Sequence, residues 1–79
     1  MEIEVKLFAT LQEYLPKGGG RYSCKLTVEN GASVSEVLGR LKVPEKMPKI
    51  ILINGKYAHI DSILQPSDVL SVFPPLGGG

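Results

Sequence analysis

The residues best suited to chemistry stand together at positions 74–79, where the sequence reads Pro-Pro-Leu-Gly-Gly-Gly. Glycine has no Cβ and adopts nearly any backbone conformation, so this segment is expected to thread a narrow channel in another protein. Pro74 and Pro75 fix the exit direction and limit the entropy lost on insertion. The group delivered would be the α-carboxylate of Gly79. The alternatives are a frayed tail without function and an engineered remnant.

A carboxylate is a poor electrophile until it is converted to an acyl phosphate or an acyl adenylate. The glycines at 18–20 lack the Lys-Ser/Thr of a P-loop and the spacing of a dinucleotide fingerprint, so they are interpreted as a hairpin loop. The sequence contains no other candidate nucleotide site. Activation of Gly79 is therefore expected to come from a partner.

Two phenylalanines form the second candidate site. Phe8 continues the outward row of Glu4 and Lys6, and Phe73 alternates with Leu70 and Val72. If the two strands are neighbours, the rings form an exposed apolar patch, which usually marks a partner site. The alternative is that the strand ends bend and both rings enter the core.

The remaining candidates favour structural roles. The serines have only His59 as a base, and no nucleophile elbow surrounds any of them. Cys24 falls on the apolar face of its strand, which indicates a core residue. Asp68 is expected to bind the backbone of its own turn. Because Cys24 and His59 are the only soft ligands, no metal site is predicted.

These residues must be positioned by a single small domain, since 79 residues support one modest core. Alternation and continuous apolar runs predict five strands, and two capping boxes, Thr10–Glu13 and Ser33–Glu36, predict two helices. The longer helix carries one apolar stripe and is expected to end at Pro44. The expected strands are Glu2–Phe8, Tyr22–Val28, Lys49–Asn54, Lys56–Ala58 and Val69–Phe73, and the expected helices are Leu11 to about Leu15 and Val34 to about Pro44.

The order of these elements predicts an α+β, β-grasp fold with a mixed sheet packed on one main helix. The first two strands are expected to pair antiparallel, with Tyr22, Cys24, Leu26 and Val28 on one half-buried face. The strand Lys49–Asn54 is apolar without alternation and is expected to be covered on both faces or over most of its length. Residues 1–75 then form the domain, and residues 76–79 form a flexible diglycine tail.

The composition of the chain limits the classes of partner that it is expected to bind. Nine basic against eight acidic residues leave a net charge of +1, which supports neither nucleic-acid binding nor a polybasic membrane anchor. No apolar run reaches the roughly 20 residues of a membrane span. A single cysteine fits a reducing compartment, so a cytoplasmic protein is expected.

Several motifs then resemble one known family, the MoaD/ThiS group of ubiquitin-like sulfur carriers, and most of all its molybdopterin synthase small subunits. The resemblance covers nearly the whole chain. Ser67 stands where the family usually has glycine, which is expected to stiffen that turn. The matching segments are Phe8–Glu13, Val28–Val34, Ile53–Gly55, Leu64–Pro75 and the terminal Pro-Pro-x-x-Gly-Gly, in which Gly78 and Gly79 are the functional diglycine and Gly77 is a variable position.

The resemblance implies a carrier rather than an enzyme. An E1-like adenylyltransferase would use Mg-ATP, bound by that partner and not by this chain, to adenylate the Gly79 carboxylate. A sulfur donor protein would then yield a thiocarboxylate. In the molybdopterin branch the tail enters the synthase large subunit, which implies a hetero-oligomer. By position, Phe8 and Phe73 correspond to exposed docking residues of the family, with Tyr57 as a third candidate.

Three alternatives remain open beside this function, and the simplest is a plain β-grasp interaction module whose tail is incidental. A ubiquitin-like modifier would use the same diglycine to form isopeptide bonds with lysines. A carrier of the same kind would serve thiamine synthesis or tRNA thiolation instead of molybdopterin.

Overall fold

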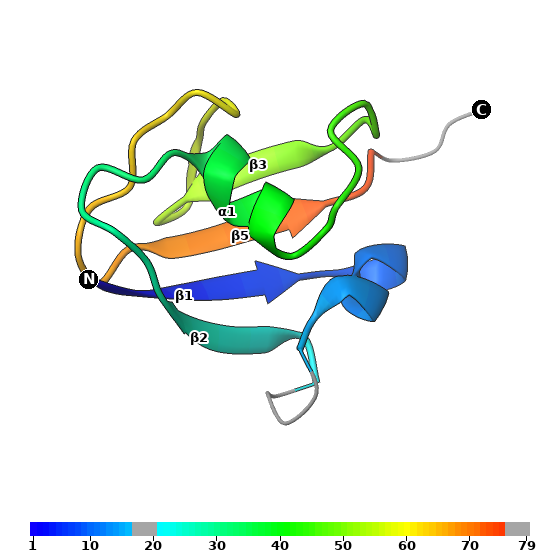
Figure 1. Cartoon of the computed structure of the whole chain (residues 1–79). Coiled ribbons are helices and arrows are strands. Elements are labelled where there is room, and N and C mark those ends of the chain that lie inside the picture. The colour runs from blue at the N-terminus through cyan, green and yellow to red at the C-terminus, as the bar shows by residue number, and fades with distance from the viewer. Residues whose placement is uncertain (17–20, 76–79) are drawn as a thin grey trace.

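The computed structural model describes residues 1–16 and 21–75 (Figure 1). Gly77, Gly78 and Gly79, predicted as the reactive tail, lie outside these residues, as does the 17–20 loop. The elements follow each other in the expected order, with differences at some of their bounds. They are β1 (Glu2–Leu7), the 3-10 helix η1 (Ala9–Tyr14), β2 (Ser23–Thr27), α1 (Val34–Arg40), β3 (Ile50–Ile53), β4 (Lys56–Tyr57) and β5 (Val69–Phe73).

The strands form one mixed sheet in the order β2-β1-β5-β3-β4. β1 pairs antiparallel with β2, as expected, and parallel with β5, while β3 pairs antiparallel with both β5 and β4. The first and last strands are thus side by side at the centre of the sheet. Together with α1 across one face, this arrangement is the predicted α+β, β-grasp fold (Figure 1).

The core lies between α1 and the sheet, and the alternation along the strands builds it. Val5 and Leu7 of β1 pair with Leu70 and Val72 of β5, and all four are fully buried. Burying side chains of this size is the main favourable term in folding. The side chains of the alternate residues of these strands form the opposite, outer face of the sheet.

Helix α1 begins as the sequence predicts and ends earlier. Ser33 Oγ accepts a hydrogen bond from Glu36 N at 3.1 Å, as an N-cap does. The helix stops at Arg40 rather than at Pro44. Lys42 has a φ of +66°, and the Lys42 and Val43 amides donate to the Gly39 and Leu38 carbonyls. This pattern is a Schellman motif, which ends a helix without a proline.

The expected capping box at Thr10 does not form. Helix η1 begins at Ala9, its N-cap is Phe8, and no side chain caps it. The Phe8 amide donates to the Val72 carbonyl at 3.1 Å, so β1 stays attached to β5 up to this residue. A left-handed Ala9, with a φ of +53°, then turns the chain so that Leu11 reaches the core. Tertiary packing therefore decides where this helix starts.

Among the described residues, neither helix combines the length and the apolar character that crossing a bilayer requires.

Candidate functional site

The two phenylalanines lie together on the outer face of the sheet. Their ring centroids are 4.3 Å apart and the ring planes are inclined by only 2°. The parallel pairing of Leu7 with Val72 brings the next residues, Phe8 and Phe73, into line. Both rings are half-buried, whereas Leu7 and Val72 are fully buried in the core. The structure therefore places both aromatics outward, as the alternation predicts, and not in the core.

Tyr22 extends this pair to an aromatic stack of three rings, Tyr22, Phe8 and Phe73. Its ring centroid is 5.4 Å from that of Phe8, with the planes inclined by 25°, and 44% of the residue is exposed. The sequence interpretation had placed Tyr22 in one half-buried row with Cys24 and Val28, which is wrong for this residue. Tyr22 precedes the first residue of β2, so the alternation of the strand does not apply to it.

Strand β3 contributes its own outer row. Ile51 is buried, but Ile50 and Leu52 are only partly covered, because they pair with Phe73 and Ser71 on the outer face. The strand is thus covered over most of its length, which is one of the two expected arrangements, while its outer face is covered only in part. The unbroken apolar run supplies one face to the core and the other to an exposed surface.

These rows enclose an apolar groove of about 360 Å³. Tyr57 is 86% exposed and pairs with Leu52. Pro74 belongs to the lining too, so the groove ends where β5 gives way to the two prolines and the segment 76–79 follows. Its lining residues are Phe8, Ala9, Ile50, Leu52, Tyr57, Phe73 and Pro74.

The exposed apolar area of this groove is suited to binding a protein. Interfaces are enriched in aromatic side chains, and rings stacked before binding lose little conformational entropy on contact. The three predicted docking residues, Phe8, Phe73 and Tyr57, all line this one groove. Pro75 is exposed beyond it.

The other polar candidates have local structural roles. The Asp68 carboxylate accepts hydrogen bonds from Gln65 N and from Asn54 Nδ2, each at 2.8 Å. This confirms that it binds the backbone of its own turn. His59 is exposed in a turn, where its amide donates to Ser62 Oγ at 3.0 Å.

Cys24 is buried, as predicted from the apolar row of β2. Burial raises the pKa of its thiol above the ordinary value, and the nearby Glu4 carboxylate adds to the rise. A raised pKa leaves less thiolate at neutral pH, so Cys24 is a poor nucleophile. Within residues 1–16 and 21–75, no group of three His, Cys, Asp or Glu side chains could hold a metal ion.

The sequence matches the profile of the ThiS family over residues 5–79. It is 32% identical to small archaeal modifier protein 3 of Haloferax volcanii in an alignment covering all of both chains. The solved structure of the putative molybdopterin-converting factor subunit 1 of Pyrococcus furiosus is similar with a TM-score of 0.72 and 25% identity, over 95% of this chain and 98% of that one.

A second solved structure shows a similar fold inside an assembly. It is the protein–protein complex of subunits 1 and 2 of the molybdopterin-converting factor of Helicobacter pylori. The matched chain has a TM-score of 0.63 and 21% identity, over the whole of both chains. At that identity the likeness speaks for the fold alone, and the contact with a second subunit is a property of that protein.

Proposed function

The chain belongs to the ThiS family, and from this membership we propose that it is a sulfur carrier that acts through the carboxylate of Gly79. An E1-like enzyme adenylates this carboxylate, and the resulting thiocarboxylate donates its sulfur in the synthesis of molybdopterin. The observation that carries the proposal is the apolar groove, whose lining includes Pro74, two residues before the segment 76–79.

The chemistry takes place on the last residue and needs no catalytic side chain of this domain. The activating partner supplies Mg-ATP, and the Gly79 carboxylate displaces pyrophosphate to form an acyl adenylate. Sulfur delivered at the oxidation level of hydrosulfide then displaces AMP and leaves a thiocarboxylate. The thiocarboxylate sulfur then bonds to the acceptor, and water cleaves the resulting acyl–sulfur bond. This leaves the sulfur on the acceptor and restores the Gly79 carboxylate, so the same chain can be charged again.

The groove would serve both partners in turn. Its floor of Phe8, Phe73 and Ile50 is apolar, and Pro74 at its end is rigid, so a protein seated on the groove has the tail at a defined starting point. The activating enzyme and the large subunit of molybdopterin synthase are the two proposed occupants. Binding them at one surface makes their complexes mutually exclusive, so charging and delivery would take place in separate complexes.

The test follows the mass of the intact chain. The full-length protein is incubated with the cognate adenylating enzyme, Mg-ATP and a sulfur donor. A carrier gains the mass difference between one sulfur and one oxygen, and the gain disappears when Gly78 and Gly79 are deleted. A chain that is adenylated but never acquires sulfur would contradict the proposal.

The name of the relative from Haloferax volcanii, a modifier protein, favours a second candidate function. A ubiquitin-like modifier would form an isopeptide bond between Gly79 and a lysine of another protein. Incubation with cell extract separates the two functions, because a modifier yields covalent conjugates of higher mass. The two outcomes can also coexist, since both begin with the same adenylate.

The acceptor of the sulfur is tested separately. Loss of the gene is expected to abolish molybdopterin, while growth without added thiamine and tRNA thiolation continue. A strain that instead requires thiamine, or lacks thiolated tRNA, would assign the carrier to one of those pathways.

A further inference from the structure

Strand β2 is an edge of the sheet, and part of its backbone is open to a further strand. The amide of Leu7 donates to the Tyr22 carbonyl, and the amide of Val28 donates to the Met1 carbonyl. In this antiparallel register every second residue, counted from Tyr22 to Val28, bonds to β1. The residues between them turn their N–H and C=O groups away from β1. The outward residues of β2 are Ser23, Lys25 and Thr27.

Arg40 of α1 marks the far end of this open edge. Its guanidinium donates to the Thr27 carbonyl, so one outward acceptor is already used. Within the described part of the chain, Ser23 and Lys25 keep outward groups for which no backbone partner is found. A partner strand would therefore meet these two residues first and then reach Arg40.

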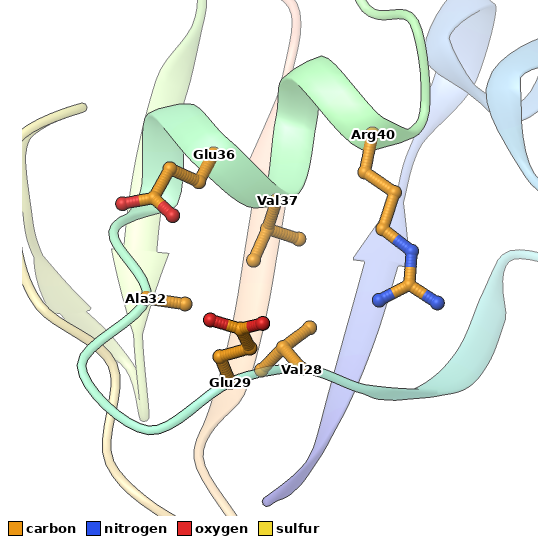
Figure 2. A pocket seen from close by; sticks show the side chains of 6 residues that line it. All are labelled: Val28, Glu29, Ala32, Glu36, Val37 and Arg40. Atoms are coloured by element: carbon orange, nitrogen blue, oxygen red, sulfur yellow. The ribbon is translucent and has the colours of Figure 1, made fainter.

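A shallow hollow lies next to that end, between the loop after β2 and helix α1 (Figure 2). Its volume is about 160 Å³, which is below the roughly 300 Å³ at which small-molecule pockets begin. The space suits one or two protein side chains rather than a cofactor. We call it the α1 hollow, and it is lined by Val28, Glu29, Ala32, Glu36, Val37 and Arg40.

The lining combines an apolar floor with acidic walls. The side chains of Val28, Ala32 and Val37 turn into the hollow, and the Glu29 and Glu36 carboxylates approach it from opposite sides (Figure 2). Glu36 also accepts from Ser33 Oγ at 3.3 Å. The Arg40 side chain points away from both carboxylates toward β2, where it binds Thr27. The charge of the two glutamates is thus available to a cation from outside.

We propose that the β2 edge and the α1 hollow together form a second docking site, which binds an extended segment of a partner protein with aliphatic and basic residues on one face. The backbone of the segment pairs with Ser23 and Lys25. Its aliphatic side chains enter the hollow, and a lysine or arginine reaches Glu29 and Glu36.

A second copy of the chain is the less favourable occupant. Antiparallel pairing of two β2 edges about Lys25 would place lysine opposite lysine, and like charges directly opposite each other destabilise a sheet. The same lysine protects the edge against uncontrolled pairing. The site lies on the edge and the helix side of the sheet, away from the apolar groove on the outer face. One chain can thus hold two partners at once.

The test uses the full-length, ¹⁵N-labelled chain and a blocked seven-residue peptide. The peptide has valine at its second and fourth positions, lysine at its sixth, and serine or threonine elsewhere. NMR titration is expected to shift the amides of Ser23, Lys25, Ala32 and Val37 in a saturable way. The Phe73→Asp variant should bind the peptide unchanged, since Phe73 lies in the other site.

Lys25→Pro tests the backbone pairing, with Lys25→Ala as the matched control. Proline removes only an outward N–H that β1 does not use, so β2 remains paired within the sheet. The proline variant is expected to bind at least about tenfold more weakly, and the alanine variant close to normally. Equal binding by both variants would overturn the strand addition.

A charge exchange tests the hollow independently of the edge. Glu29→Lys is expected to weaken the lysine peptide by about tenfold and to favour a peptide with glutamate at the sixth position. If Lys25→Pro fails to fold, this exchange still decides the proposal. Shifts confined to Phe8 and Phe73, dimerisation of the chain through β2, or no saturable shift would each overturn it.

Discussion

Phe73 lies outside the core and lines the apolar groove, so its proposed role in docking can be tested separately from folding. The Phe73→Asp variant is expected to fold, because its side chain lies outside the core and removal of the stack with Phe8 costs only about 1 kcal/mol. Docking should weaken by several kcal/mol, about 3, since an unpaired carboxylate would be buried in an apolar interface. The measurement is the rate of adenylation by the activating enzyme at limiting carrier concentration.

The matched control for this prediction is Phe73→Leu, which keeps an apolar side chain and should retain most of the activity. Adenylation unaltered in Phe73→Asp would argue against the groove as the docking surface. An unfolded Phe73→Asp protein, seen by circular dichroism, would show that the ring contributes to the core.

The backbone of Ser67 is strained. The resemblance to the family indicated only that serine replaces the usual glycine in this turn. The φ of Ser67 is +68°, in the left-handed region, where residues other than glycine pay about 1–2 kcal/mol. Its amide donates to the Glu2 carbonyl at 2.8 Å, and glycine would keep that bond. Ser67→Gly is therefore expected to raise the free energy of unfolding by about 0.5–1 kcal/mol, after the entropy cost of glycine is subtracted. Urea denaturation measures this difference.

The same substitution at Ser35 is the control for Ser67→Gly. Ser35 lies inside α1, where the backbone suits any residue, so glycine there should lower the free energy of unfolding by about 0.5–1 kcal/mol. If both variants lose stability, the left-handed turn at Ser67 is not strained.

At the scale of elements, the turn between β3 and β4 is attached to the start of β5 through Asn54. Its amide side chain donates to Asp68 at 2.8 Å and accepts from Val69 N at 2.9 Å, and its φ is +52°. Asn54→Ala loses both bonds and also disfavours the left-handed turn, so about 2–4 kcal/mol of stability should be lost. Asn54→Gly loses the bonds alone and should cost less. Thermal unfolding of the two variants separates the two contributions, and equal losses would assign the whole effect to the hydrogen bonds.

Strand positions were predictable because alternation is a local signal. β5 has the predicted bounds, and the outward direction of Phe8 and Phe73 follows from counting residues along β1 and β5. The turn at Asn54-Gly55 was also predictable, since both residues have positive φ and the pair favours this conformation.

Helix ends and edge positions depend on neighbours, and the sequence interpretation was wrong or silent there. Thr10 is not a cap because the pairing of Phe8 with Val72 sets the start of η1. The end of α1 is fixed by the left-handed backbone conformation of Lys42. A lysine in the sequence does not predict this conformation. Tyr22 joined the aromatic stack only through the bend before β2, which no periodicity encodes.

At the scale of the whole molecule, the domain and residues 76–79 are proposed to divide two tasks, docking and delivery. Adding a phenylalanine after Gly79 should leave folding unchanged, because all residues of the hydrophobic core lie within residues 1–72. It should abolish thiocarboxylate formation, since the carboxylate would then belong to a bulky residue. Intact mass spectrometry after activation checks this, and a charged extended chain would refute the proposal that Gly79 is the reacting residue.

The position of β5 in the sheet makes the fold and the groove depend on a late part of the chain. This strand comes late in the chain, yet it lies between β1 and β3 and supplies both core residues and one wall of the groove. A copy broken before Val69 loses the central strand, and the two halves of its sheet have nothing to join them. If the activating enzyme docks in the groove as proposed, such fragments would not bind it, and binding would select chains that are intact through Phe73.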